Sequence, residues 1–223
     1  MVYILFIGIA LLSFLVQGNL QGRFKRYSRI PLSNGMTGRE VAELMLRQNG
    51  IDDVTVTSIS GRLTDHYNPA SHTVNLSEDV YDSCSVAAAA VAAHECGHAL
   101  QHKLGYAPLR MRSALVPVVQ FSSSIVSWIL LGGILLVNTF PQLLLFGICL
   151  FALTTLFSII TLPVEINASM RALQWLNQAG ITDSHNHAQA QGALRSAAYT
   201  YVVAALSSLA TLVYYVLIYT NRR

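Results

Sequence analysis

The chain has 223 residues, of which 53% are hydrophobic and only 11% are charged, and its mean hydropathy is +0.47. A soluble globular protein usually carries about 25% charged residues, so this composition excludes an ordinary soluble enzyme and indicates an integral membrane protein. The formal net charge of +3 lies mostly beside apolar segments, where lipid headgroups explain it better than a nucleic-acid partner does. The three cysteines have no metal-site or redox spacing and imply no disulfide framework.

Four segments are predicted to cross a bilayer, which takes about 20 residues of helix. Residues 1–22 carry no charge and lack both a basic start and a small-residue cleavage site, which indicates a membrane anchor and not a signal peptide. Residues 113–163 contain no charged residue or histidine, and the stretch Asn138–Pro141 divides them into the two halves of a membrane hairpin. Residues 198–220 form the last predicted span, with tyrosines near both ends. The predicted fold class is therefore mainly α and integral to the membrane, with about four transmembrane helices.

Basic residues beside the predicted spans indicate the orientation in the membrane. They follow the first span and precede the second, on one side of the bilayer: Arg23, Lys25, Arg26, Arg29, Arg110 and Arg112. Because cytoplasmic flanks are enriched in Lys and Arg, we expect this side to be the cytoplasm. Arg222 and Arg223 would then lie on the opposite side, against the rule.

The remaining residues, 28–112 and 164–197, are predicted to form one small α+β domain that the hairpin interrupts. Thr37–Glu40 has the pattern of a capping box, and Gly50 is typical of the end of the helix that would follow. Residues 54–59 and 72–76 alternate between polar and apolar as strands do, while residues 65–69 have the composition of a turn. We expect a small sheet whose segment 73–76 is the candidate to bind an extended peptide by backbone hydrogen bonds.

The most specific pattern in the chain is His-Glu-x-x-His at residues His94–His98. The Ala-rich run 85–101, with Asp82 or Ser83 as its N-cap, predicts a helix here. Two histidines four residues apart then share one helix face and are able to bind zinc, with Glu95 beside them as the general base of a hydrolase. A catalytic zinc takes three protein ligands and leaves a fourth position for water, so one ligand must come from elsewhere in the chain.

Glu165 is the strongest candidate for the third ligand. Two membrane crossings return the chain to the side that it left, so the segment after the hairpin emerges beside the helix of His94 and His98. His102 is an alternative ligand if the helix ends or bends near it. A separate alternative is that Glu165 only caps a helix at the membrane interface. The other histidines, of which the last two form a His-x-His pair, are predicted to lie in turns or at a solvated helix start: His66, His72, His185 and His187.

Five motifs along the chain resemble one family. They are residues 35–42, 65–67, 76–81, 93–99 and 163–169. With the order of anchor, zinc helix, hairpin, Glu segment and final span, they resemble the YugP-type neutral zinc metallopeptidases of bacterial membranes, which are distantly similar to the membrane protease HtpX in the wider Glu-zincin group. The resemblance implies a zincin-like catalytic domain in the bacterial inner membrane and a polypeptide substrate, and the basic residues beside the spans predict that this domain faces the cytoplasm.

The same resemblance implies roles for particular residues. His94, His98 and Glu165 would bind one zinc ion, and Glu95 would be the catalytic carboxylate. Such families often carry Asp shortly after the third ligand, where this chain has Asn167 and Ser169. Asn167 is therefore only a candidate to orient a ligand, because a neutral side chain orients a histidine less strongly than a carboxylate does.

These residues predict a hydrolytic mechanism. Zinc lowers the pKa of its bound water towards 7 and polarises the scissile carbonyl, and Glu95 would take the proton of the water and return it to the leaving amine. The developing oxyanion needs a further donor, for which Arg171, Tyr67 and His66 are candidates. The expected function is that of a membrane-anchored endopeptidase acting on membrane-associated or misfolded polypeptides. The alternative is a zinc-stabilised scaffold or assembly partner without turnover, whose zinc would have a fourth protein ligand.

Overall fold

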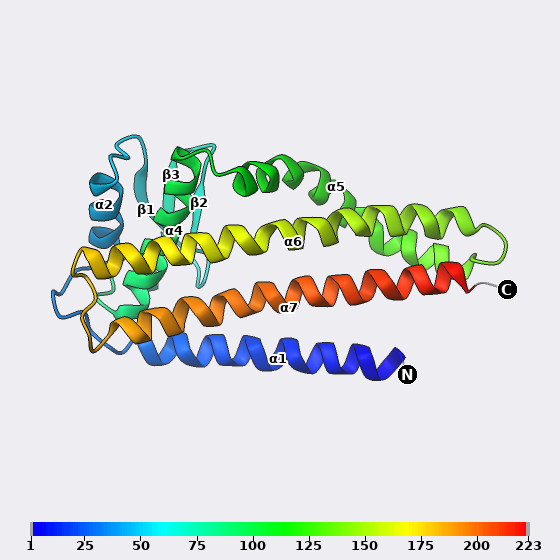
Figure 1. Cartoon of the computed structure of the whole chain (residues 1–223), viewed down its shortest axis with the longest axis horizontal. Coiled ribbons are helices and arrows are strands. Elements are labelled where there is room, and N and C mark those ends of the chain that lie inside the picture. Colours follow the sequence, from blue (N-terminus) through cyan, green and yellow to red (C-terminus); the bar gives the residue numbers. More distant parts are fainter. Residues whose placement is uncertain (1, 222–223) are drawn as a thin grey trace.

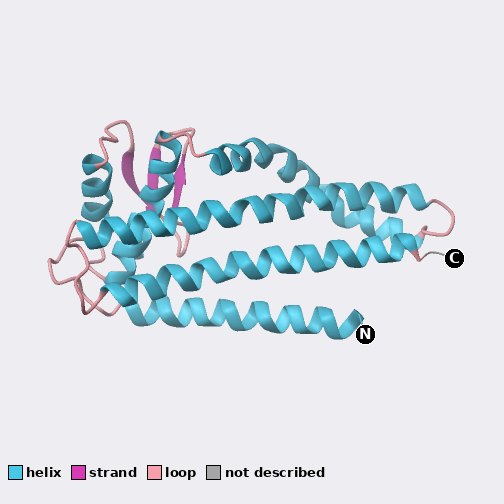
Figure 2. Cartoon of the chain, in the orientation of Figure 1, coloured by secondary structure: helices cyan, strands magenta, loops and turns pink. Residues whose placement is uncertain are grey.

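The computed structural model describes the backbone of residues 2–221 and the side chains of residues 6–221. Its longest helices lie side by side along the molecule, and the three-stranded sheet lies at one end of them (Figure 1). These helices are α1 (Val2–Tyr27), α5 (Ala107–Leu135), α6 (Pro141–Gln178) and α7 (His187–Thr220). Figure 2 shows that the strands are confined to this end and that the rest of the molecule is helical. The fold is mainly α with a small sheet, as the composition predicted.

The elements around the sheet come from the segment between α1 and α5. They are α2 (Gly38–Gln48), β1 (Thr55–Ile59), β2 (His66–Asn68), β3 (Thr73–Ser77), α3 (Glu78–Tyr81) and α4 (Val86–Lys103). The strand order is β1-β3-β2, with β3 parallel to β1 and antiparallel to β2. Two predictions are therefore wrong. Residues 66–68 form a strand and not a turn, and the segment 73–76 is a central strand whose two edges are already paired, so it cannot bind a peptide.

The two predicted helix starts have different outcomes. The capping box is confirmed, since the Thr37 N–H donates to Glu40 Oε2 at 2.8 Å and the Glu40 N–H donates to Thr37 Oγ1 at 3.2 Å. The N-cap of α4 is Ser85, whose Oγ accepts from the Ala88 N–H at 3.2 Å. The prediction of Asp82 or Ser83 as this cap was wrong because the helix begins two or more residues later.

The hydrophobic core lies between α2, β3, α4 and the ends of α6 and α7 that adjoin the sheet. Fully buried side chains from each layer meet here, among them Val41, Met45, Val74, Leu76 and Leu176. The buried alanines of α4 have almost no exposed surface, and such small side chains let neighbouring helices approach the zinc-motif helix closely. This core holds α4 in place against α6.

Three of the described helices are long and apolar enough to cross a membrane, namely α5, α6 and α7. Their faces carry large apolar side chains that the protein does not cover, such as Phe121 and Trp128, which are 67% and 75% exposed. The predicted anchor, residues 1–22, forms most of α1, which packs along α7 through an edge-to-face contact of Phe6 with Tyr214. That α1 is a fourth span remains a prediction. Arg222 and Arg223 lie outside the described residues.

The hairpin returns the chain to the sheet, as predicted. The turn between α5 and α6 lies at the end of the molecule far from the sheet, as do the first residues of α1 and the last of α7 (Figure 1). Helix α6 is continuous through Pro163 and carries Glu165 beyond the predicted end of the hairpin. With 38 residues it is about 57 Å long, nearly twice the ~30 Å thickness of the hydrocarbon core. One helix therefore serves both as a membrane segment and as a wall of the domain.

Candidate metal centre

Helices α4 and α6 touch at Gly97, in the middle of the His-Glu-x-x-His motif. A Cβ atom at Gly97 would lie 2.7 Å from the backbone oxygen of Ala168, closer than real Cβ atoms come to other atoms. Only glycine permits this approach, because the obstacle is backbone and not a flexible side chain. The contact sets His94 and His98 of α4 directly opposite the residues that follow Pro163 on α6.

His94, His98 and Glu165 form a compact set of donor atoms. Glu165 Oε2 lies 3.2 Å from His94 Nε2 and 3.6 Å from His98 Nε2, and the three donors all lie within 4.8 Å of one another. Two ligand atoms that bind one zinc tetrahedrally at about 2.0–2.2 Å lie roughly 3.3–3.6 Å apart, so the residues fit the ion. Within residues 2–221 this is the one group of His, Cys, Asp and Glu side chains arranged in this way. The alternative ligand His102 is not part of it.

Each imidazole uses its other ring nitrogen within the protein. His94 Nδ1 lies 3.1 Å from Ser169 Oγ, and His98 Nδ1 lies 3.1 Å from Gln101 Oε1. An amide oxygen only accepts hydrogen bonds, so His98 carries its proton on Nδ1 and presents the Nε2 lone pair to a metal. Both rings are thereby turned with Nε2 towards Glu165.

Gln101 is completely buried and is itself held by α6. Its Nε2 donates to the Val164 carbonyl at 2.8 Å and to Asn167 Oδ1 at 3.0 Å, and Arg171 Nε donates to the same Asn167 oxygen at 2.7 Å. Asn167 thus orients a ligand indirectly, through Gln101. The sequence interpretation did not identify Gln101, although its position three residues after His98 places it on the same helix face.

Glu95 lies between the ligands and the edge of the sheet. Its side chain is buried, and its Oε2 accepts the backbone N–H of Tyr67 in β2 at 3.0 Å. A single N–H of the edge strand therefore fixes the carboxylate beside the donor group. The geometry agrees with the role of a base that acts on a molecule bound at this group.

The electrostatic surroundings of His98 favour a positive charge. Burial alone would lower the pKa of this imidazole, but its hydrogen bond with Glu165 and the charges of Glu95 and Glu165 outweigh that effect, and its pKa is raised. Two carboxylates in a nearly dry site thus attract a cation. A zinc ion would supply the positive charge that the site favours.

Two cavities meet at the donor group. The larger, of about 590 Å³, extends towards the first turns of α5, and the smaller, of about 140 Å³, lies against α7. Both are lined by five shared residues, namely Asp65, His94, Glu95, Glu165 and Tyr201. The smaller cavity has an apolar wall that includes Val91, Leu194, Ala197 and Ala198. Tyr201 was missed in the sequence because it lies in a predicted membrane span and has no motif around it.

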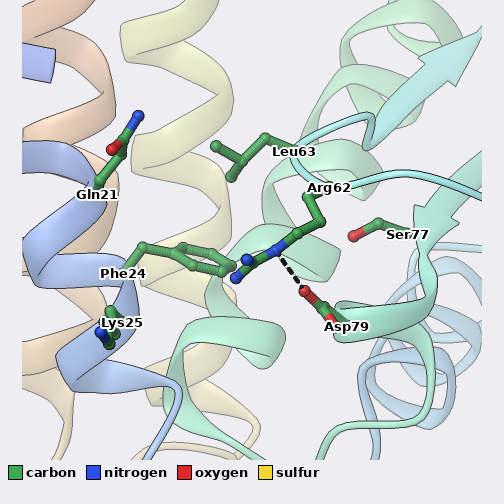
Figure 3. A pocket seen from close by; sticks show the side chains of 7 residues that line it. All are labelled: Gln21, Phe24, Lys25, Arg62, Leu63, Ser77 and Asp79. Atoms are coloured by element: carbon green, nitrogen blue, oxygen red, sulfur yellow. Dashed lines mark ion pairs between the residues drawn. The ribbon is translucent and has the colours of Figure 1, made fainter.

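A third hollow lies between α1 and the loop that carries Arg62 and Leu63. Its volume is about 350 Å³, and Figure 3 shows Gln21, Phe24 and Lys25 of α1 on one side of it and Arg62 and Leu63 on the other. Arg62 Nε forms an ion pair with Asp79 Oδ2 at 2.9 Å. Leu63 lines both this hollow and the smaller cavity and has a φ of 58°, a left-handed conformation that is uncommon for a non-glycine residue. Leu63 therefore separates the smaller cavity from the hollow at α1.

The candidate oxyanion donors lie in different places. His66 and Tyr67 line the larger cavity, where the Tyr67 hydroxyl is 2.8 Å from His102 Nδ1 and His66 Nδ1 is 2.8 Å from the Thr64 carbonyl oxygen. Arg171 faces Asn167 and lines neither of the two cavities at the donor group. His66 and Tyr67 therefore lie at the donor group, whereas Arg171 lies on the other side of Asn167, away from the two cavities.

The remaining predicted histidines make local contacts. His72 Nδ1 pairs with Asp53 Oδ2 at 2.8 Å, and His187 Nδ1 lies 2.8 Å from Thr182 Oγ1. The His185 N–H donates to Asp183 at the turn before α7. None of the three lies in the donor group, in agreement with the interpretation of these residues as parts of turns.

A helix with His-Glu-x-x-His, a glutamate on a second helix that could hold a metal ion with the two histidines, and adjoining helices that could span a membrane are the features of a membrane-bound zinc metallopeptidase. Comparison with known families agrees. The profile of the family described as "Putative neutral zinc metallopeptidase" matches residues 2–220, and the chain belongs to this family.

One curated relative is similar over almost the whole chain. It is described as "Putative membrane protease YugP" of Bacillus subtilis (strain 168), and it is 43% identical over 212 residues, which cover 95% of this chain and 93% of the relative. No solved structure was found to match the chain. The predicted resemblance to YugP-type zinc metallopeptidases is confirmed.

Proposed function

We propose that this protein is a membrane-anchored zinc endopeptidase in which His94, His98 and Glu165 hold one zinc ion and Glu95 is the general base. The observation that carries the proposal is the Glu95 carboxylate, fixed by β2 beside a complete set of three zinc donors. A purely structural zinc site is closed by a fourth protein ligand and has no use for such a base. Zinc, when bound, would polarise the scissile carbonyl and lower the pKa of its water.

The residues of the chain then divide the remaining work. Glu95 accepts the proton of the attacking water at its carboxylate and delivers it to the amine that leaves. Its hydrogen bond from the Tyr67 N–H leaves one carboxylate oxygen for this purpose. The donor for the oxyanion is proposed to be the hydroxyl of Tyr67, which lines the larger cavity. The two ring nitrogens of His66 already face the Thr64 carbonyl oxygen and the Asn75 side-chain nitrogen.

The cavities favour an endopeptidase. An enzyme that removes single residues from a chain end must close its cleft on one side of the catalytic group. Here Glu95 lines two cavities, of which one extends towards α5 and the other lies against α7. A polypeptide is therefore able to continue on both sides of the bond that is cut.

The position of the site favours substrates at the membrane surface. Glu165 lies 24 residues after the start of α6 at Pro141, which is about 36 Å along the helix and beyond the ~30 Å hydrocarbon core. We infer that cleavage occurs at the surface and not within the bilayer, on membrane-associated or misfolded polypeptides. The basic residues at this end support a proposed location at the cytoplasmic face of the bacterial inner membrane, with α1 as a proposed fourth span.

Glu95→Gln tests the proposal. We expect the detergent-purified wild type to contain one zinc and to cleave casein, and the variant to keep its zinc but lose activity by roughly 10²–10⁴-fold, the usual contribution of a general base. Glu43→Gln is the matched control, because Glu43 is an exposed residue that pairs with Arg39 on the surface.

A variant as active as the wild type would disprove the role of Glu95. Zinc without cleavage in the wild type, for casein and for membrane proteins alike, would favour the scaffold. A protein without zinc would remove both functions.

A further inference from the structure

The two oxygens of the Glu165 carboxylate have different partners. Oε2 faces both imidazoles, at 3.2 Å from His94 Nε2 and 3.6 Å from His98 Nε2. Oε1 instead lies 3.4 Å from Nη1 of Arg112. Since the Glu165 side chain is only 3% exposed, water cannot readily replace either partner. The oxygen that would bind zinc and the oxygen that would not are thus already distinguished by the protein.

Arg112 reaches this position from the first helix of the hairpin. In the sequence it is one of two basic residues that flank a span, and its only expected role was to set the orientation in the membrane. In the structure its side chain is 30% exposed and lines the larger cavity next to Glu165. The guanidinium is permanently charged and has no lone pair to offer a metal, so it serves the site only as the cation of an ion pair with the carboxylate.

Arg112 completes a pattern in which each zinc donor contacts another side chain of the protein. Ser169 contacts His94 and Gln101 contacts His98, and these partners lie on α6 and α4, the helices that carry the proposed ligands. Arg112 comes from α5, which carries none of the three donors. The state of the hairpin is therefore connected to the geometry of the third ligand.

We propose that Arg112 is a positioning residue, which holds Oε1 of Glu165 so that the carboxylate binds zinc through Oε2 alone. This inference rests on the proposed zinc site. A carboxylate is able to bind a metal through one or both oxygens, and the second oxygen would take the coordination position that water and the scissile carbonyl need. The guanidinium also withdraws charge from the carboxylate, which leaves the zinc a stronger Lewis acid.

Arg112→Gln and Arg112→Lys test the inference. We expect Arg112→Gln to lower kcat with little change in KM, because Oε1 then takes a coordination position that the reaction needs. The variant should also bind zinc more tightly, because a positive charge beside the site is lost and an oxygen ligand is gained. Arg112→Lys keeps the charge, so it should recover part of the wild-type kcat and zinc affinity. Arg195→Gln is the control, since Arg195 is an exposed arginine of α7 whose partner is Tyr199.

The cobalt-substituted protein gives a readout that needs no turnover. The visible absorption of Co²⁺ is stronger with four ligands than with five, so Arg112→Gln should weaken these bands and Arg195→Gln should leave them unchanged. Melting temperatures of the cobalt-loaded variants show that each is folded. The inference is overturned if Arg112→Gln keeps both the zinc affinity and the cobalt spectrum, or if KM rises with kcat unchanged, which would assign Arg112 to substrate binding.

The two proposals fail in different ways. A changed cobalt spectrum in Arg112→Gln, combined with a wild type that cleaves nothing, would support the role of Arg112 and contradict the peptidase activity. A fully active wild type, combined with identical cobalt spectra for the wild type and Arg112→Gln, would support the peptidase activity and contradict the role of Arg112.

Discussion

His98 is oriented by a chain of hydrogen bonds whose direction is fixed at its far end. The Arg171 guanidinium only donates, so the Asn167 atom that it contacts must be the amide oxygen. The same oxygen accepts from Gln101 Nε2, which turns Gln101 Oε1 towards His98 Nδ1. The neutral amide of Asn167 is a weaker partner than the carboxylate often found near such ligands. Here, however, the charged Arg171 fixes which atom of this amide is the oxygen.

Gln101→Ala should weaken zinc binding about 10–100-fold, because His98 loses the partner that fixes its tautomer and ring orientation. Competition with a chromophoric chelator measures the change. Gln48→Ala is the control, since the Gln48 side chain also takes part in a partly buried hydrogen bond, from Trp175 Nε1 to its Oε1 at 2.8 Å, and Gln48 is not one of the residues around the zinc donors. Equal zinc affinity in Gln101→Ala and Gln48→Ala would contradict this account of His98.

The roles of some residues follow from local spacing or from the order of segments, whereas the roles of others depend on contacts between residues far apart in the sequence. The spacing of His94 and His98 is a property of one helix, and Glu165 followed from counting membrane crossings. The partners of these ligands depend on contacts between distant parts of the chain, such as that of Gln101 with the Val164 carbonyl across 63 residues. Arg112 and Tyr201 were hidden for the same reason, because both belong to helices whose composition indicates only the membrane.

At the scale of elements, the approach of α4 to α6 depends on Gly97. Gly97→Ala should force the two helices apart and destabilise the fold by about 1–3 kcal/mol, the usual cost of overpacking, while it lowers zinc occupancy. Thermal unfolding and metal analysis of the purified protein measure both effects. Gly22→Ala is the control, because a Cβ at Gly22 in α1 would meet no atom within 4 Å. Wild-type zinc content in Gly97→Ala would show that the contact is not needed.

The capping box of α2 should make part of the stability depend on pH. The backbone N–H of Thr37 and its hydroxyl bind the Glu40 carboxylate and lower the pKa of Glu40 below its ordinary 4.5. The stabilisation is therefore complete above pH 4.5 and is lost as the pH falls through the lower pKa of the folded state. Glu40→Ala should melt below the wild type at neutral pH, and the difference should shrink in acid. A difference that stays constant down to pH 3 would contradict this.

Local signals placed the helices better than the strands. The Thr37–Glu40 box carries its own hydrogen bonds and was confirmed, whereas β2 was predicted to be a turn. Its three residues, His66–Asn68, precede a proline and lie among turn-forming residues. They form a strand because β3 pairs with them and because the backbone N–H of Tyr67 donates a hydrogen bond to Glu95. Such tertiary contacts override weak local preferences.

For the whole molecule, the important feature is that the ligands are divided by the membrane hairpin. His94 and His98 precede it and Glu165 follows it, so a zinc ion would connect two parts of the chain that the hairpin separates. The order of segments was predictable from hydropathy alone. The continuity of α6 was not, because residues 113–163 and 164–197 were predicted as separate segments, whereas α6 runs through Pro163.

Removal of zinc should therefore destabilise the entire domain. An ion that binds only the folded state at 100 times its Kd stabilises by about 2.7 kcal/mol, which for a protein of this size corresponds to a melting temperature roughly 5–10 °C higher. We expect a chelator to lower the melting temperature of the detergent-purified wild type by this amount. Glu165→Ala should melt at the lower temperature with or without chelator, because it lacks the ligand that ties α6 to α4. If the chelator lowers both proteins equally, zinc stabilises the fold at a place other than this site, and the connection across the hairpin is wrong.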